Sequence, residues 1–174
     1  VAGYSVYSVN VGTGTLTQLV NANPPFGFSQ PLDGFTALAD YDADGDLDAI
    51  VAANTEFGGG SATQVLVYVW DIQTATVIAT SATFTSPTTG HIQQPTVADF
   101  DNDGLVEVGF AYENNYVVLD DHNSGLSTLW SKTVVDDTAF HNAAVFDFQG
   151  DGEAEIVYQD ENTLYVLEGS TGNT

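Results

Sequence analysis

Three aspartate-rich segments of nine residues constrain this chain more than any other feature of its sequence. Their shared template is D-x-D-x-D-G-x-x-D/E, with glycine at position 6 and an acid at position 9. Carboxylates packed this closely repel one another unless a hard cation lies between them, and calcium takes six to eight oxygen ligands at such sites. The template therefore predicts calcium-binding loops at residues 40–48 (loop 1), 99–107 (loop 2) and 147–155 (loop 3).

The spacing within each loop predicts its ligands. Side chains at positions 1, 3 and 5 can converge on one centre, and the acid at position 9 closes the shell. Position 7 varies in chemistry, as expected if its backbone carbonyl binds, and glycine at position 6 permits a backbone conformation that other residues resist. The predicted ligands are Asp40, Asp42, Asp44, Asp46 and Asp48 in loop 1, Asp99, Asp101, Asp103, Leu105 and Glu107 in loop 2, and Asp147, Gln149, Asp151, Glu153 and Glu155 in loop 3.

Loop 3 is expected to be the weakest of the three sites. Gln149 stands at position 3, where the other two loops carry an aspartate. An amide oxygen can ligate calcium, but it brings no negative charge. We therefore predict Ca²⁺ in loops 1 and 2 and a weaker site in loop 3.

Two other readings of the loops fit the sequence less well. An EF-hand needs a bidentate glutamate at position 12, where this chain has Val51, Phe110 and Tyr158. Plain Asp-Gly turns commonly join strands, but they do not explain three copies that each end in an acid. The flanking runs are short and rich in β-branched and aromatic residues, which is typical of strands.

The spacing of the loops predicts a repeating β-architecture. Their glycines recur at positions 45, 104 and 152, and a period of about 50 residues indicates propeller blades or another stacked array. In the second period we expect strands at 95–100, 106–112, 116–120 and 127–134, with the calcium loop joining the first two. The predicted fold class is all-β, with blades of four antiparallel strands.

Two segments carry a resemblance to a known family. Residues 97–104 (VADFDNDG) and 144–152 (AVFDFQGDG) resemble the FG-GAP/VCBS repeats, which form calcium-binding β-propeller blades in integrin α-subunits and many bacterial surface proteins. The resemblance covers nearly the whole chain, although residues 57–60 (FGGG) match an FG-GAP core only loosely. It implies a fold and a metal, but not one function, because the family includes adhesins, lectins, toxin scaffolds and enzyme domains.

The repeat divides the chain into about three blades. We expect residues 1–174 to be one propeller segment, with the end of one blade at 1–35, complete blades at 36–94 and 95–142, and an incomplete blade at 143–174. Propellers usually have four to eight blades. The remaining blades are therefore expected from a longer chain or from a partner chain.

Composition restricts the partners. The chain has 24 acids against one base, Lys132, and a net charge of −23. Phosphate contacts need lysine and arginine, so nucleic acid is excluded, and no apolar run approaches the 18 residues of a membrane span. Extracellular calcium modules bind at about 10⁻⁴–10⁻³ M, which favours an extracellular or cell-surface location for a chain that also lacks cysteine.

No pattern of catalytic residues is present, so we do not expect an enzyme. The three histidines, His91, His122 and His141, are read as polar loop residues. Asp136, outside the loops, is expected to matter little for stability.

Three functions remain open. The leading prediction is a non-enzymatic, calcium-stabilised module for adhesion or assembly, with an extracellular protein or a glycan as partner. A carbohydrate-binding, lectin-like propeller would need exposed aromatics such as Phe26, Phe28 and Phe140. The third is a non-catalytic scaffold of a polysaccharide-degrading enzyme.

Overall fold

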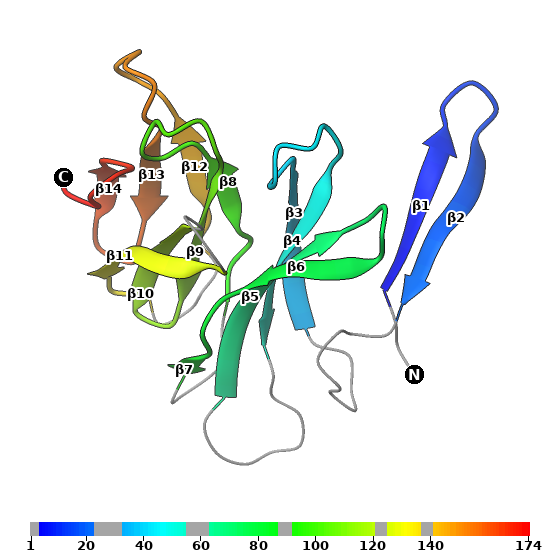
Figure 1. Ribbon diagram of the computed structural model, residues 1–174. Helices are drawn as coiled ribbons and strands as arrows, with labels where there is room; N and C mark the ends of the chain where they lie inside the picture. The colour runs from blue at the N-terminus through cyan, green and yellow to red at the C-terminus, as the bar shows by residue number, and fades with distance from the viewer. Residues whose placement is uncertain (1–3, 23–32, 55–62, 87–91, 121–124, 137–140) are drawn as a thin grey trace.

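The computed structural model describes residues 4–22, 33–54, 63–86, 92–120, 125–136 and 141–174. Within these ranges every regular element is a β-strand, and the strands form antiparallel sheets of two to five strands (Figure 1). The all-β prediction is therefore confirmed. No helix in the described ranges is long and apolar enough to cross a membrane.

The strands follow one another along the chain sheet by sheet. A hairpin of β1 (Tyr4–Asn10) and β2 (Thr15–Ala22) comes first. The second sheet has β3 (Asp33–Ala39), β4 (Asp48–Asn54), β5 (Thr63–Asp71), β6 (Thr76–Thr80) and β7 (Phe84–Ser86). The third has β8 (Thr96–Ala98), β9 (Glu107–Tyr112), β10 (Asn115–Asp120) and β11 (Ser127–Thr133), and the fourth has β12 (Ala143–Phe146), β13 (Glu155–Gln159) and β14 (Leu164–Leu167).

The third sheet matches the expected blade. Its strand order is β8-β9-β10-β11, with each strand antiparallel to the next one along the chain. The four strands expected in this period are all present, and their ends differ from the expected ones by no more than two residues. Short runs rich in β-branched and aromatic residues were enough to locate them, and the two middle strands, β9 and β10, are buried along nearly their whole length.

The second sheet differs from the expected four strands because its outer edge is divided. The long strand β5 pairs with β6 at one end and with β7 at the other. Between them, the Ser81 hydroxyl accepts a hydrogen bond from the Val67 N–H at 2.9 Å, and the Ser81 N–H donates to the Val67 carbonyl at 2.8 Å. A serine side chain thus replaces the backbone partner that a continuous outer strand would supply.

The middle strands are buried on both faces, as strands between stacked sheets must be. In β10, Val117 and Leu119 pack in a core shared with the second sheet, whereas Tyr116 and Val118 pack in a core shared with the fourth. Fully buried side chains alternate between these two cores along the strand. Stacking of neighbouring sheets, rather than one central core, therefore holds the described part of the chain together.

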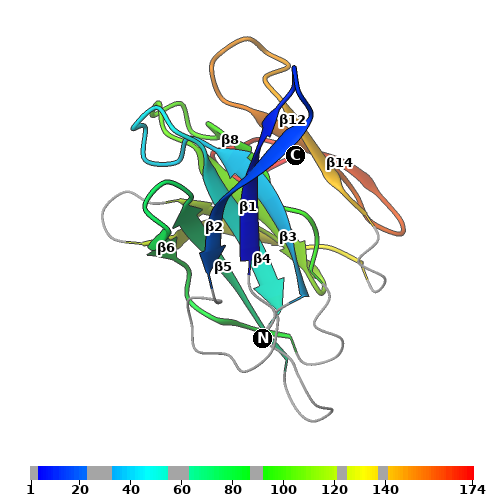
Figure 2. The ribbon, with the colours of Figure 1, turned by 90° about the vertical axis from the view of Figure 1, so that its right-hand side faces the viewer.

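The sheets lie side by side in chain order. Figure 1 shows the β1–β2 hairpin at one end and β14 with the C-terminus at the other, and Figure 2 shows the hairpin from its own side. The first strand of each later sheet lies beside that of the next, since β8 contacts both β3 and β12. This is the arrangement of successive propeller blades around an axis, and the described residues do not form a closed ring. The blade boundaries stay a prediction.

Candidate metal centres

Each aspartate-rich loop joins the first and second strands of its sheet. Loop 1 connects β3 to β4, loop 2 connects β8 to β9, and loop 3 connects β12 to β13. The acid at position 9 is the first residue of the second strand in every case. The predicted placement between paired strands is confirmed, and it brings the start and the end of each loop together.

The backbone curls through two left-handed residues in each loop. The glycines at position 6 have φ angles of 96°, 92° and 100° in Gly45, Gly104 and Gly152, which confirms their expected role. Position 4 is also left-handed, at Ala43 (58°), Asn102 (61°) and Gly150 (75°). The sequence analysis missed position 4, because its three residues share no side-chain chemistry.

Backbone hydrogen bonds to two acids hold each loop in the same shape. The position 1 carboxylate accepts the glycine N–H, at 3.1 Å for Gly45 and Asp40 and at 3.0 Å in loops 2 and 3. The position 9 carboxylate accepts the N–H of position 2, as from Phe100 to Glu107 at 2.5 Å. The same bond joins Tyr41 to Asp48 at 3.0 Å and Phe148 to Glu155 at 2.7 Å.

The folded loops bring three acids together at each site. One carboxylate oxygen from each lies within 4.8 Å of the others, which is close enough for a shared metal ion. The three groups are Asp40, Asp42 and Asp48 in loop 1, Asp99, Asp101 and Glu107 in loop 2, and Asp147, Asp151 and Glu155 in loop 3. These nine residues were all predicted ligands.

Glu107 provides the strongest sign that loop 2 fits a cation. Its side chain is 1% exposed, and its Oε1 atom is buried without a hydrogen-bond partner in the described part of the chain. Burial, followed by the charges of Asp101, Asp120 and Asp99, raises the pKa of Glu107 to about 8, although the Phe100 N–H opposes the shift. A buried carboxylate oxygen without a donor is costly unless it is protonated or meets a cation.

Loop 1 repeats this arrangement less deeply. Asp40 Oδ1 is also buried without a hydrogen-bond partner among the described residues. Asp48 is 4% exposed, and burial raises its pKa, with further contributions from the charges of Asp42, Asp71 and Asp44. Both loops therefore hold an ionisable oxygen that a hard divalent cation would satisfy.

Six predicted ligands lie outside the three groups. Asp44 and Asp103, at position 5, each accept the N–H of position 7, at 2.9 and 2.8 Å. The position 7 side chains of Asp46 and Leu105 are exposed, and Glu153 accepts a hydrogen bond from Ser170, so side-chain ligation at position 7 is not favoured. Ligation through its backbone carbonyl stays a prediction.

The sixth residue, Gln149, has a hydrogen bond of its own. Its Nε2 donates to Glu155 Oε1 at 3.0 Å and lies 3.3 Å from Glu168 Oε2. Ligation through the Gln149 amide oxygen would require the amide to turn over. Asp147 in the same loop has a lowered pKa, chiefly because the Gly152 N–H donates to it.

Several other candidates lie outside the described residues, namely Phe26, Phe28, residues 57–60, His91, His122 and Phe140. His141 is described, and its Nδ1 lies 3.3 Å from Asp136 Oδ1. Asp136 is 2% exposed and accepts hydrogen bonds from Tyr158 and Gln93. This burial between two sheets argues against the expectation that Asp136 matters little for stability, because its loss would leave the Tyr158 hydroxyl and the Gln93 amide without their acceptor.

Comparison with known families supports the proposed repeat. Residues 40–110, which include loops 1 and 2 and the strands between them, match the FG-GAP-like repeat. The resemblance noted in the sequence is thereby confirmed for this part of the chain. Neither a curated protein nor a solved structure matched the chain.

Proposed function

We propose that this chain, through its FG-GAP-like repeat, is a non-enzymatic, calcium-stabilised module of propeller blades used in adhesion or assembly. The repeat and the stacked sheets indicate a propeller-like module. We further propose that the bound metal is calcium, that the module lies outside the cell or at its surface, and that its role is adhesion or assembly. The proposal is supported by three loops of one geometry that each collect three acids, with one oxygen of each acid within 4.8 Å of the others.

The observation that carries the proposal is the buried Glu107 oxygen. Native structures rarely leave a buried carboxylate oxygen without a donor. Asp99 and Asp101 each bring an oxygen within 4.8 Å of a Glu107 oxygen. A monovalent ion would leave most of that charge uncompensated. Carboxylate oxygens are hard ligands that suit Ca²⁺, and when bound the ion supplies charge neutralisation and a link between the ends of the loop.

Calorimetric titration of chelator-treated protein tests the metal. We expect two sites of higher affinity for calcium and a weaker third, with Kd values in the range of about 10⁻⁴–10⁻³ M typical of extracellular modules. Asp101→Ala should remove the loop 2 site, and Asp42→Ala should remove the loop 1 site. Absence of binding at millimolar calcium would contradict the proposal.

The fourth sheet supports the proposal that further blades belong to the module. Its outer face carries large apolar side chains that are more than half exposed, at Phe146, Phe148, Leu164 and Val166. The opposite face of the same sheet is buried against the third sheet. We propose that another blade of a longer chain covers this apolar face, since the faces between the second and third sheets and between the third and fourth are covered in that way.

Sedimentation measurements distinguish a further blade from a second copy. Residues 1–174 should stay monomeric or aggregate without a defined stoichiometry, because the missing cover is a blade of different sequence. A stable, concentration-dependent dimer that Phe146→Ser abolishes would instead assign the face to a second copy of the chain.

The proposed setting is outside the cell or at its surface. Millimolar calcium is available there, and loops of this affinity would be empty in cytosol. A glycan array compared with protein-binding assays would separate carbohydrate binding from protein adhesion. Binding in either assay that is lost in chelator would link the function to the loops.

A further inference from the structure

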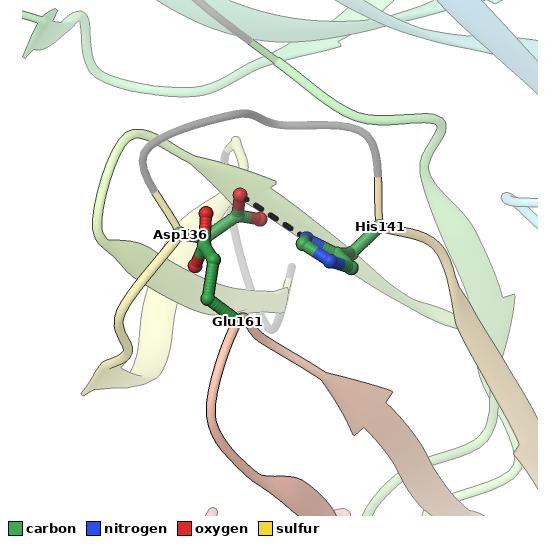
Figure 3. Close-up of side chains that lie close together, drawn as sticks. All are labelled: Asp136, His141 and Glu161. Atoms are coloured by element: carbon green, nitrogen blue, oxygen red, sulfur yellow. Dashed lines mark hydrogen bonds and ion pairs between the residues drawn. The ribbon is translucent and has the colours of Figure 1, made fainter.

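A fourth group of metal-ligating side chains lies away from the aspartate-rich loops. Asp136 follows β11, His141 precedes β12, and Glu161 lies in the turn between β13 and β14. One ligand atom of each lies within 4.8 Å of the others. Figure 3 shows the Glu161 carboxylate and the His141 ring on either side of the Asp136 carboxylate. We call these three residues the DHE cluster.

Asp136 is the fixed member of the DHE cluster. Its Oδ2 accepts hydrogen bonds from the Tyr158 hydroxyl and from Gln93 Nε2, both at 2.5 Å. Its N–H donates to Asn114 Oδ1 at 3.0 Å. Both of these donors meet on Oδ2, and Oδ1 faces His141, 3.3 Å from Nδ1. Outer-shell donors of this kind orient metal ligands in proteins.

Tyr158 remains a donor under all ordinary conditions. Burial raises its pKa strongly, and the hydrogen bond to Asp136 raises it further. The phenol proton is therefore kept on Tyr158 and shared with Asp136 Oδ2. The outer shell of Asp136 does not depend on pH in the neutral range.

The position of Glu161 is set by its neighbour Asp160. Asp160 Oδ1 accepts the N–H groups of Asn162 and Thr163, and Asp160 Oδ2 accepts that of Val135 at 2.8 Å. The Glu161 N–H itself donates to the Val135 carbonyl at 3.1 Å. This turn is therefore tied to the segment that carries Asp136, so two acids from different sheets are held near each other.

Asp136 and Glu161 bring two carboxylates close together in a chain that has few basic side chains. Lys132 is the chain's single lysine or arginine, and its Nζ donates to the Gly172 carbonyl and lies 5.5 Å from the centre of the Tyr165 ring. The imidazole of His141 can carry a proton, or it can share a divalent ion with the two acids. The second arrangement neutralises both carboxylates at neutral pH.

We propose that the DHE cluster binds a transition-metal ion of the zinc class, separately from calcium. An imidazole nitrogen is a poor ligand for calcium but a usual one for Zn²⁺, which also accepts aspartate and glutamate oxygens at about 2.0–2.2 Å. Glu161 is exposed and His141 is partly exposed, so both side chains can close on the buried Asp136. With three protein ligands, one position is left for water.

The bound ion would link the third and fourth sheets. Asp136 extends from the edge strand of the third sheet, and Glu161 belongs to the fourth. The aspartate-rich loops and the DHE cluster would then both stabilise the stacked sheets through bound metal, the loops with calcium and the cluster with zinc. This inference does not depend on calcium binding by the loops.

Zinc titration of calcium-saturated protein tests the proposal. We expect one zinc ion per chain beyond the bound calcium, with millimolar calcium unable to displace it. His141→Ala and Glu161→Gln should each weaken zinc binding by about tenfold or more. His122→Ala, which removes a histidine outside the cluster, and Asp151→Asn, which alters loop 3, should leave zinc affinity unchanged. Asp136 is not replaced, because its loss would also unpair Tyr158 and Gln93.

Broadening of the His141 ring signals by Co²⁺ in nuclear magnetic resonance spectra provides an independent readout. The proposal is overturned if His141→Ala binds zinc as tightly as the unaltered protein, if zinc binding is lost in Asp151→Asn, or if no zinc binds at millimolar concentration. If protonation of His141 stabilises the metal-free protein and zinc has no effect, the imidazolium of His141 would be the cation that neutralises Asp136 and Glu161 instead of a metal ion.

Discussion

Asn102 in loop 2 donates a hydrogen bond from its side-chain nitrogen to the backbone carbonyl of Asp151 in loop 3, 3.2 Å away. Nearby, the Ala154 N–H donates to the Asp99 carbonyl at 3.0 Å. A Cβ atom at Gly152 would lie 2.8 Å from the Asn102 side chain, so any larger residue there would displace Asn102. Two candidate metal loops from adjacent sheets are therefore in direct contact.

This contact predicts that loops 2 and 3 bind calcium cooperatively. An ion in loop 2 would fix Asp99 and Asn102, and so lower the cost of ordering loop 3. Asp101→Ala should weaken calcium binding at loop 3 as well as at loop 2. In an Asn102→Ala background this effect should shrink by about 0.5–1.5 kcal/mol, the usual net value of one hydrogen bond. A double-mutant cycle on calcium Kd values measures it.

Loop 1 provides the control for this cycle. Loops 1 and 2 line a shared pocket of about 140 Å³, with Tyr41 and Asp42 on one side and Leu105 on the other. Asp42→Ala should leave calcium binding at loop 3 nearly unchanged. Equal effects of Asp42→Ala and Asp101→Ala on loop 3 would show that the coupling does not pass through Asn102.

Glu107→Gln is predicted to change the melting temperature in opposite directions with and without calcium. In chelator, the substitution removes the free-energy cost of burying an acid whose pKa is raised to about 8, so the variant should melt at or above the temperature of the unaltered protein. In calcium it loses a ligand. Binding to the native state adds about 2.7 kcal/mol at a hundredfold excess over Kd, so the variant should then melt lower.

Thermal melts in chelator and in millimolar calcium give this comparison directly. Glu113→Gln, which alters an acid in the β9–β10 turn outside the nine-residue loops, serves as the control and should not show the reversal. A Glu107→Gln variant that is less stable in both conditions would assign Glu107 a purely structural role.

The raised pKa of Glu107 also predicts a pH dependence. The pKa of Glu107 in the folded protein, about 8, exceeds the ordinary value of 4.5. The stability that protonated Glu107 gives the metal-free protein is therefore complete below about pH 4.5 and is lost as pH rises through about 8. Calcium favours the ionised form, so calcium affinity at loop 2 should fall as pH is lowered below 8, with about one proton released per ion at pH 7.

Calorimetry in buffers of different ionisation enthalpy counts the released proton. Glu107→Gln should abolish the proton release at loop 2. Calcium binding at loop 1 should release a smaller fraction of a proton. Calcium binding at loop 2 that is independent of pH between 6 and 8 would contradict the raised pKa.

The sequence located the loops and strands well because both depend on local pattern. Alternating apolar residues and a repeated template of acids and glycine are visible in the chain itself, and the acids at positions 1 and 9 did meet in every loop. Ligation by position 5 stays a prediction. Asp44, Asp103 and Asp151 all accept the N–H of position 7, but of these three only Asp151 also belongs to the acid group of its loop, a difference that the template does not specify.

Contacts between sheets could not be predicted from the same pattern. Asp136 lies 22 residues from Tyr158 and 43 from Gln93, and nothing in its immediate sequence differs from that of an exposed loop. Its burial follows from how the third and fourth sheets stack. The divided outer strand opposite β5 was missed for a similar reason, because Ser81 replaces a backbone partner with its side chain.

Ala43→Gly is predicted to stabilise the protein. Ala43 has a φ of 58° at position 4 of loop 1, where loop 3 has Gly150, and a residue with Cβ pays about 1–2 kcal/mol in the left-handed conformation. Part of this gain is offset by the greater freedom of glycine in the unfolded chain, so we expect a net increase of about 0.5–1 kcal/mol in the free energy of unfolding.

Ala75, with a φ of 59° in the β5–β6 turn, should respond to the same substitution. Ala144→Gly, in strand β12, should lower stability instead, because glycine weakens a strand. Urea unfolding in chelator compares the three variants free of calcium, and destabilisation by Ala43→Gly would show that the alanine methyl group makes a contact worth more than the relieved strain.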